Sequence, residues 1–190
     1  MLDVKGSHDN LNEIPLDCGL YKIVNEKNIQ QGDIIEDCIV YQLQKLPEIS
    51  KGTTKAVYPA EVHDLIVLTQ TCDLVQENAE QIVLASIVPM SAIGEINKHY
   101  ATDKGLEEIR RGYIPSLYMM PACQLENYER EIRIVNFHRT FTLSTSYIDD
   151  IVNQNQTRIR LMTPFREQLS QAFARYFMRV GTPQMIPSFR

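Results

Sequence analysis

The chain has 190 residues, of which 44% are hydrophobic and 23% are charged. This length fits one compact domain, and this composition excludes intrinsically disordered, collagen-like and low-complexity proteins. The formal charge of −5 argues against strong nonspecific binding to duplex nucleic acid, because such binding depends on neutralising phosphates with Lys and Arg.

The sequence predicts a cytoplasmic protein without membrane contact. The longest strongly apolar stretch, Ile82 to Met90, is far shorter than the roughly 18–20 residues that span a bilayer, and no basic-then-apolar signal segment opens the chain. The cysteines form no close pair, so we expect reduced thiols and neither a disulfide scaffold nor a metal knuckle. They are Cys18, Cys38, Cys72 and Cys123.

Charge is distributed unevenly along the chain. Eight lysines and sixteen acids give residues 1–104 a net charge of −8, whereas eleven arginines and eight acids give residues 105–190 a net charge of +3. One interpretation is that the arginine-rich half holds an anion or an acidic partner, because the guanidinium fork matches carboxylate and phosphate. The other is that the two halves pair with each other inside one fold.

The first half of the chain is predicted to consist of strands behind a short arm. Residues 1–20 lack a sustained period and indicate a loose N-terminal arm, so that residues 21–190 form a single domain. An extended piece is expected around 20–24, a strand over 31–41, and an exposed loop over 47–59. Two buried strands follow, 62–68 and 81–89, joined either as a hairpin with an elaborate loop or through a short helix.

The second half mixes short elements with one long helix. We expect two short helices in 91–111, strands over 117–120 and 130–137 with 141–143 extending the same hairpin, and a short helix over 145–151. Thr163 as N-cap, Pro164 in the first turn and Gly181 as a stop predict a helix from Pro164 to Val180. Its apolar stripe is expected to pack on the strands as core or, secondarily, to form a dimer surface. The stripe comprises Phe165, Leu169, Phe173, Tyr176 and Val180.

The most distinctive motif is Thr69-Gln70-Thr71-Cys72-Asp73, directly after the predicted strand 62–68. Thr69, Cys72 and Asp73 are the candidate catalytic residues, and Gln70 and Thr71 are candidate ligand contacts. Unpaired N–H groups and a helix dipole at this position would favour a Cys72 thiolate. The alternative is that Cys72 is a small buried hydrophobe and that Thr71 or Asp73 caps a helix.

A catalytic cysteine needs a base, and the candidates are His63 and His138. The same histidines with Cys38 and Cys72 could be imagined as a metal site, but no pair has the short spacing typical of one, so we predict no metal. No phosphate-cradling or dinucleotide-binding glycine motif is present, so we predict no cofactor.

Arginines form a second candidate feature. Arg130, Arg133 and Arg139, with Arg158 and Arg160, lie on or near predicted strands and close in sequence to aromatic residues, which suits stacking and charge contacts to single-stranded RNA. The candidate ligand-binding residues are therefore Arg130, Arg133, Arg139 and Arg158. An exposed strand face with solvated arginines is the alternative.

Three segments resemble MazF/PemK-type toxins over residues 31–90. Gly32-Asp33-Ile34 opens a strand, Ile66-Val67-Leu68-Thr69 ends one, and a third runs from Ile82 to Pro89. The resemblance implies an SH3-like β-barrel, often dimeric, in a family that includes sequence-specific ribonucleases, and it makes Thr69 a catalytic-type hydroxyl. That family has a catalytic Arg shortly after its first strand, whereas residues 42–63 here contain none. Separately, Thr69–Leu74 and the segment Pro164–Gly181 are similar to a bacterial family of small proteins to which we attach no activity.

The combined prediction is a mainly β protein with α additions, an SH3-like barrel with a long C-terminal amphipathic helix. The first functional hypothesis is a bacterial binding module for an anionic ligand, RNA or a nucleotide, of toxin or defence type and with ribonuclease-like character. The second is a non-catalytic interaction subunit with a protein partner. The third is a cysteine-dependent enzyme that uses Cys72.

Overall fold

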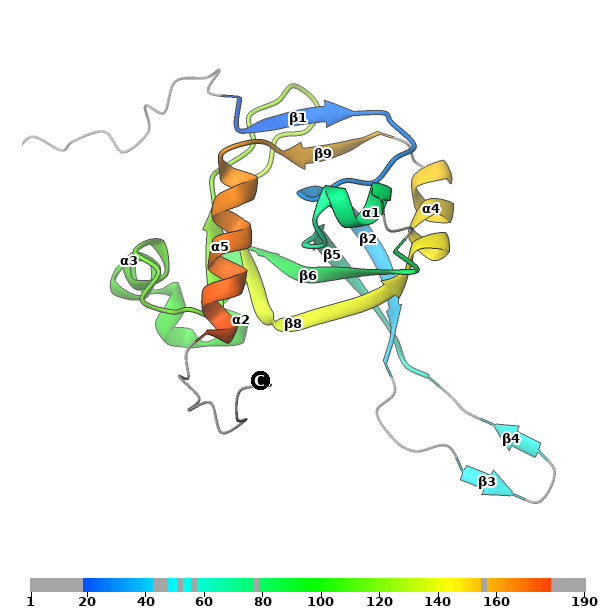
Figure 1. The fold of residues 1–190 in the computed structure, drawn as a ribbon. Coiled ribbons are helices and arrows are strands. Elements are labelled where there is room, and N and C mark those ends of the chain that lie inside the picture. The colour runs from blue at the N-terminus through cyan, green and yellow to red at the C-terminus, as the bar shows by residue number, and fades with distance from the viewer. Residues whose placement is uncertain are drawn as a thin grey trace, which may run out of the picture.

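A seven-stranded antiparallel sheet with strand order β1-β9-β2-β5-β6-β8-β7 forms the body of the molecule (Figure 1). The computed structural model describes residues 19–42, 48–50, 53–55, 58–76, 79–154 and 157–178. The strands of the sheet are β1 (Tyr21–Val24), β2 (Asp33–Tyr41), β5 (Ala60–Val67), β6 (Gln81–Pro89), β7 (Leu117–Met120), β8 (Arg133–Ser144) and β9 (Arg158–Leu161). The fold is therefore mixed α/β, with strands as its main scaffold.

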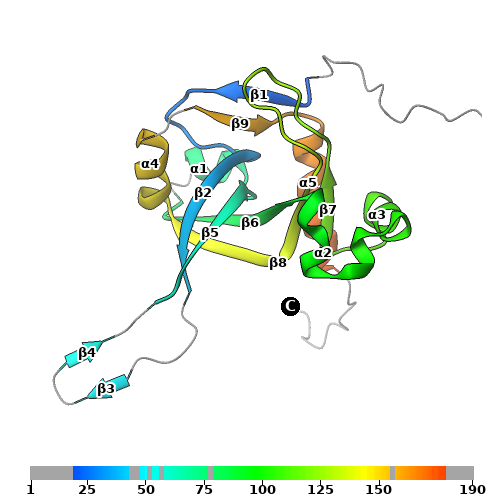
Figure 2. The same cartoon turned by 180° about the vertical axis from the view of Figure 1, so that it is seen from behind.

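Helices flank this sheet, and a small hairpin projects from it. The hairpin of β3 (Glu48–Ser50) and β4 (Thr53–Lys55) extends away from the body beyond β2 and β5 (Figures 1 and 2), so the predicted loop over 47–59 contains two paired strands. The helices are α1 (Thr71–Gln76), η1 (Met90–Ala92), α2 (Ile93–Ile96), η2 (Lys98–Ala101), α3 (Asp103–Arg110), α4 (Thr145–Gln154) and α5 (Phe165–Phe177).

The sheet curls strongly but backbone pairing does not close it into a barrel. Strands β1 and β7 are its two edges. They approach each other nevertheless, because the Tyr21 hydroxyl on β1 donates a 2.7 Å hydrogen bond to the Pro121 carbonyl just after β7. Side chains from all seven strands therefore share one inner core.

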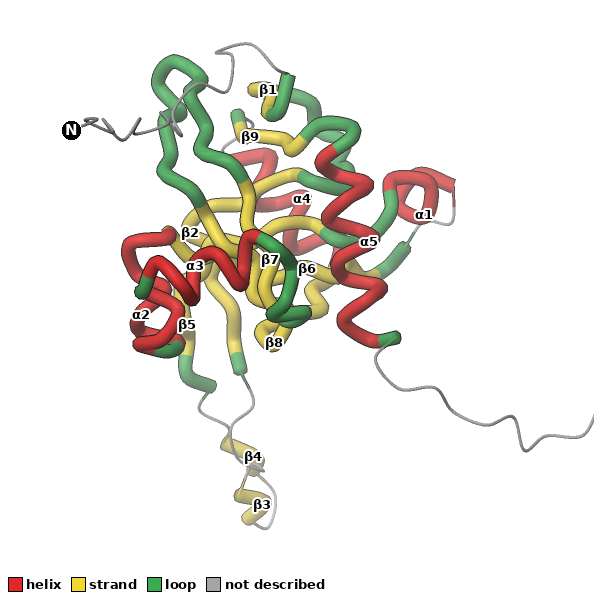
Figure 3. Tube along the Cα trace, turned by 90° about the vertical axis from the view of Figure 1, so that its left-hand side faces the viewer, coloured by secondary structure: helices red, strands yellow, loops and turns green. Residues whose placement is uncertain are grey.

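The sheet carries apolar residues on both of its faces, so other elements pack on each side of it. On the inner face, residues such as Ile34, Ile66 and Phe137 pack together with Leu169 of α5, which lies across this core. On the outer face, Ile35 and its neighbours pack under α4. A third cluster lies between β7, β8 and the α2–α3 region, which sit side by side in Figures 2 and 3.

The long C-terminal helix is confirmed as a core-packing element. Leu169 is fully buried, and Phe165, Phe173 and Tyr176 pack against the inner core as the apolar stripe predicts. The predicted cap is wrong, because the Thr163 hydroxyl donates to the Glu167 carboxylate at 3.0 Å and caps no backbone N–H. Val180 and the N-terminal arm up to residue 18 lie outside the described residues.

Strand β8 differs most from the expectation. The predicted strands 130–137 and 141–143 belong to one continuous strand that pairs with β6 along its length, and a register shift opposite Ala85 and Ser86 bends it. The two alternatives for the link between β5 and β6, a hairpin and a short helix, are both present. These strands pair antiparallel, and α1 lies in the segment that connects them. The strand over 117–120 and the helix starting at 145 are confirmed.

Candidate functional site

The Thr69–Asp73 motif lies at the end of β5, where its hydroxyl groups accept hydrogen bonds from the backbone of neighbouring segments. The Thr69 hydroxyl accepts the Val83 N–H at 2.8 Å, and the Thr71 hydroxyl accepts the Gln31 N–H at 3.2 Å. The Gln31 side-chain amide then donates at 2.8 Å to the Leu68 carbonyl and to the Ser170 hydroxyl. The motif thus connects β6, the turn before β2 and α5.

Cys72 is exposed, but its surroundings disfavour the thiolate. Its thiol donates to the Asp73 carboxylate at 3.3 Å, and this hydrogen bond is the main reason that the Cys72 pKa is raised. The expected activation by backbone N–H groups and the helix dipole is therefore outweighed by a neighbouring negative charge. Gln70 accepts a second, longer contact from the same thiol at 3.6 Å.

Neither candidate base contacts Cys72. The His63 ring pairs with Glu61 at 3.0 Å, and the His138 ring lies 3.0 Å from the Tyr176 hydroxyl. Cys38 faces His63 across β2 and β5, and burial raises the pKa of its thiol to about 11. Within the described ranges, no three side chains among His, Cys, Asp and Glu gather closely enough to hold a metal ion.

Five arginines of the C-terminal half pair with acids of the N-terminal half, as the second interpretation of the charge distribution expects, whereas Arg110, Arg111 and Arg166 pair with glutamates of their own half. Asp33, fully buried, accepts hydrogen bonds from Arg158, at 2.7 Å, and from Arg160. Arg139 contacts Glu61 at 2.6 Å. Arg130 and Arg133 both contact Glu36, and among the described residues neither forms an ion pair or hydrogen bond with the Thr69–Asp73 motif.

The Glu36 cluster is the most unusual of these ion pairs. Arg130 donates from Nε at 2.9 Å and from Nη2 at 2.7 Å to the two Glu36 oxygens, a bidentate pair, while Arg133 Nη1 reaches the same carboxylate at 3.2 Å. Strand alternation places both groups, because Glu36 follows the inward-facing Ile34 and Arg133 precedes the inward-facing Val135 by two residues. The hydrogen bond from Arg130 is the main cause of the lowered pKa of Glu36.

Arg133 is buried, and three of its five N–H donors have no hydrogen-bond partner among the described residues. Its side chain is only 4% exposed, and Nε and Nη2 have no hydrogen-bond partner among the residues described. These two nitrogens form one edge of the guanidinium. In Arg130 the corresponding edge, Nε and Nη2, donates both hydrogen bonds to Glu36. The Tyr21 hydroxyl lies close to Arg133, whose charge and hydrogen-bonding N–H groups oppose the burial that raises the tyrosine's pKa, while the Tyr21 proton itself is donated to Pro121.

Two further acids lie beside this cluster. The register of β2 against β5 shifts between Ile35 and Cys38, and Asp37 takes a left-handed φ of 53° there. The Asp37 N–H donates to Asp64 at 3.1 Å. Burial, helped by the charges of Glu36 and Asp37, raises the pKa of Asp64. The site therefore joins two arginines with one firmly ionised carboxylate and one that takes up a proton more readily than usual.

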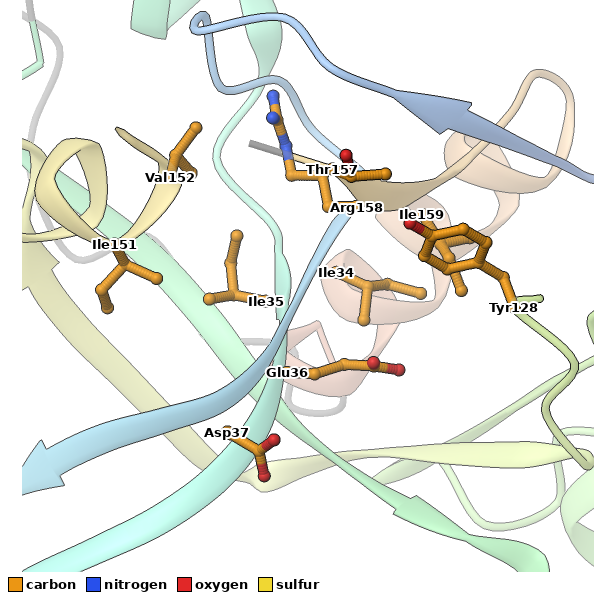
Figure 4. Close-up of a pocket in the computed structure, with 10 residues that line it drawn as sticks. All are labelled: Ile34, Ile35, Glu36, Asp37, Tyr128, Ile151, Val152, Thr157, Arg158 and Ile159. Carbon is orange, nitrogen blue, oxygen red and sulfur yellow. The ribbon is translucent and has the colours of Figure 1, made fainter. Parts of the chain in front are cut away.

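A pocket of about 220 Å³ opens beside Glu36, between β2 and β9 (Figure 4). It exists because these strands pair only at Asp33 and Ile34, after which β2 bulges and the two separate. Figure 4 shows its apolar walls on both sides of β2 and Tyr128 at one end. Its lining consists of Ile34, Ile35, Glu36, Asp37, Tyr128, Ile151, Val152, Thr157, Arg158 and Ile159.

Sequence reasoning selected Arg130 and Arg133 but missed Glu36, Asp37, Asp64 and Tyr128. A signal was available, since Glu36-Asp37 interrupts an otherwise apolar strand and acids are rare on a core-facing strand unless they are paired. In the described part of the chain no helix is both long and apolar enough to cross a bilayer. Comparisons with known protein families, with curated proteins and with solved structures found no match to this chain.

Proposed function

We propose that this chain is a binding module for a ligand with an anionic group, and that the cluster around Arg133 is its binding site. The unused Nε/Nη2 edge of the buried Arg133 guanidinium is the observation that carries this proposal. Leaving buried donors without acceptors costs about 1–3 kcal/mol, and more for a charged group. A phosphate or carboxylate that pairs with this edge in bidentate fashion would remove that cost.

The charges around the edge are compatible with an added anion. Glu36 carries one negative charge and contacts two arginines, so these three side chains together keep a net charge of +1. The arginine fork suits phosphate, so a nucleotide or an RNA phosphate is the ligand class that we favour.

Ribonuclease activity does not enter the proposal. Thr69 is the catalytic-type hydroxyl suggested by the toxin resemblance, and its oxygen accepts a hydrogen bond from Val83 at the start of β6. The SH3-like relationship stays a prediction alongside it. Cysteine-dependent catalysis receives no support from the raised pKa of Cys72.

Titration calorimetry with inorganic pyrophosphate tests the anion site. We expect wild-type binding, and at least tenfold weaker binding for Arg133→Lys, which keeps the charge but lacks the fork. Arg139→Lys is the matched control, because Arg139 pairs with Glu61 at an exposed position, and its affinity should stay within twofold of wild type. No wild-type binding, or equal binding by Arg133→Lys, would refute the proposal.

A non-catalytic interaction subunit is a second candidate with its own observation. Ile39 and Val62 face each other across β2 and β5, and Tyr41 follows on the same face. These apolar side chains are 43%, 61% and 64% exposed. Exposed apolar clusters of this kind are typical of protein contact surfaces. Replacing Tyr41 and Val62 with Ser would abolish capture of a stoichiometric partner under this candidate and leave pyrophosphate binding intact.

A further inference from the structure

We infer that the open edge of β2, residues 35–41, binds an extended segment of a partner protein, which adds a strand to the sheet and presents a basic residue to Asp37. This inference rests on the second candidate function, that of an interaction subunit, and not on the anion site at Arg133. Three features of the edge support it: its unpaired backbone groups, its exposed apolar side chains and its charge.

Strand β2 is paired on one side only over most of its length. It pairs with β5 as far as Tyr41, but it pairs with β9 only at Asp33 and Ile34, and no other strand of the described chain pairs with it. Beyond the start of β2, the two strands β2 and β5 therefore leave the body of the sheet as a ribbon (Figures 1 and 2). An open strand edge is a template on which an extended peptide can pair.

Two hydrogen bonds show which backbone groups face outward from this ribbon. The Gln42 N–H donates to the Pro59 carbonyl at 3.3 Å, so residue 42 points its backbone groups toward the β5 side. Because these directions alternate along an antiparallel strand, the N–H and C=O groups of Tyr41 and Ile39 point away from β5. The Tyr147 hydroxyl from α4 accordingly reaches the Ile39 carbonyl at 2.6 Å, and that oxygen keeps a second lone pair for an incoming N–H.

Apolar side chains accompany the open backbone groups. Ile39 and Tyr41 lie on the same face as Val62, the cross-strand partner of Ile39, and all three side chains are exposed. A strand paired beside β2 would place every second side chain next to this face. At the other end of the edge lies the pocket between β2 and β9. A cavity of about 150 Å³ holds benzene, so this pocket of about 220 Å³ has room for the side chain of a phenylalanine.

Charge determines which kind of segment fits. Strand β2 contains three acids and neither Lys nor Arg. Asp33 and Glu36 pair with arginines, whereas Asp37 is exposed and forms no ion pair with the described residues. A second copy of β2 would bring the same three acids to this edge, and like charges on neighbouring strands repel. Charge complementarity therefore favours a basic segment of a different protein.

The peptide Val-Thr-Val-Thr-Arg-Phe, with both ends capped, tests the inference. Antiparallel to β2, it places its valines beside Tyr41 and Ile39, its arginine beside Asp37 and its phenylalanine at the pocket. Fluorescence anisotropy with the full chain should show saturable binding, at least tenfold weaker when Glu replaces the arginine of the peptide. Asp37→Asn should reduce this preference at least threefold; Asn adopts the left-handed backbone of residue 37 readily, so the variant keeps the fold.

N-methylated peptides test whether the backbone is paired. In the proposed register the valine N–H groups donate to the carbonyls of Tyr41 and Ile39, whereas the threonine N–H groups point away from β2. Methylation of both valine nitrogens should abolish binding. Methylation of both threonine nitrogens is the matched control and should leave the affinity within threefold. Equal effects of the two methylations, or no saturable binding of the parent peptide, would overturn the inference.

The outcomes separate this inference from the proposed functions. If Tyr41→Ser/Val62→Ser loses a stoichiometric partner but the two methylations act equally, the interaction subunit stands and strand addition falls. A wild-type dimer that the peptide dissociates would assign the edge to a second copy and overturn the choice of partner. Absence of pyrophosphate binding refutes the anion site alone, because the peptide titrations make no use of it.

Discussion

Replacing Glu36 with Gln isolates the energetic role of the paired arginines. The substitution preserves the shape of the side chain but removes the charge that Arg130 and Arg133 share. Arg133 would then be a cation with a 4% exposed side chain and no carboxylate in contact. Arg130 would lose the same partner, but its side chain is 37% exposed and can be solvated.

The expected loss of stability follows from these two exposures. Removing one partner of a buried ion pair costs about 3–5 kcal/mol, because the other charge stays buried without compensation. The pair with Arg130 adds about 1 kcal/mol or less. Since Glu36 itself is 31% exposed, water can partly replace it, and we expect a total of about 3 kcal/mol. For a domain of this size that corresponds to a fall in Tm of roughly 6–12 °C.

Urea denaturation followed by circular dichroism measures the change. The double variant Glu36→Gln/Arg133→Met removes the stranded cation and should recover more than half of the loss. Glu61→Gln is the control, because Glu61 contacts Arg139 at 2.6 Å and the Arg139 side chain is 46% exposed and can be solvated, so the stability of this variant should be near wild type. A loss below about 1 kcal/mol for Glu36→Gln, or a double variant less stable than the single one, would refute the reasoning.

Three further predictions concern pH, a glycine and a thiol. Because Arg130 lowers the pKa of Glu36, its contribution is present above the unfolded value of about 4.3 and is lost as pH falls through the lower folded value; urea midpoints of wild type and Glu36→Gln should therefore converge below pH 4. Gly32→Ala should cost about 1–3 kcal/mol more than Gly19→Ala in the same assay, since both have positive φ but only at Gly32 would a Cβ lie 2.8 Å from a carbonyl oxygen; equal costs would contradict the close approach. Cys72 should react slowly with iodoacetamide at pH 8 for an exposed thiol, and Asp73→Asn should accelerate it, as read by mass spectrometry of its peptide; an unchanged rate would show that Asp73 does not hold the thiol protonated.

The local elements of this fold could be read from the sequence because each has a strong local cause. Runs of β-branched residues predict β2, β5 and β6, and the spacing of apolar residues together with Pro164 and Gly181 predicts α5. The error at β8 has a clear source: the bulge near Asn136 gives residues 138–140 exposed positions that resemble a turn, although the strand continues.

The candidate site could be predicted only in part, because it is built from distant segments. Arg130 and Arg133 drew attention through their charge, but their partner Glu36 is more than 90 residues away in the chain. A periodic pattern tells which face of a strand is buried and not which strand lies beside it. The pocket depends on such a pairing, since it exists only where β2 separates from β9.

The position of β9 has a consequence for how the protein is made. In the sheet this last strand lies between the first two, pairing with β1 on one side and with β2 on the other. During synthesis, the ion pairs of Asp33 with Arg158 and Arg160 can form only after β9 has left the ribosome. Contacts between the ends of a chain form slowly, because a long loop must close before they give any stabilisation. The sheet therefore stays incomplete, with the Asp33 carboxylate unpaired, until β9 is synthesised and inserts between β1 and β2.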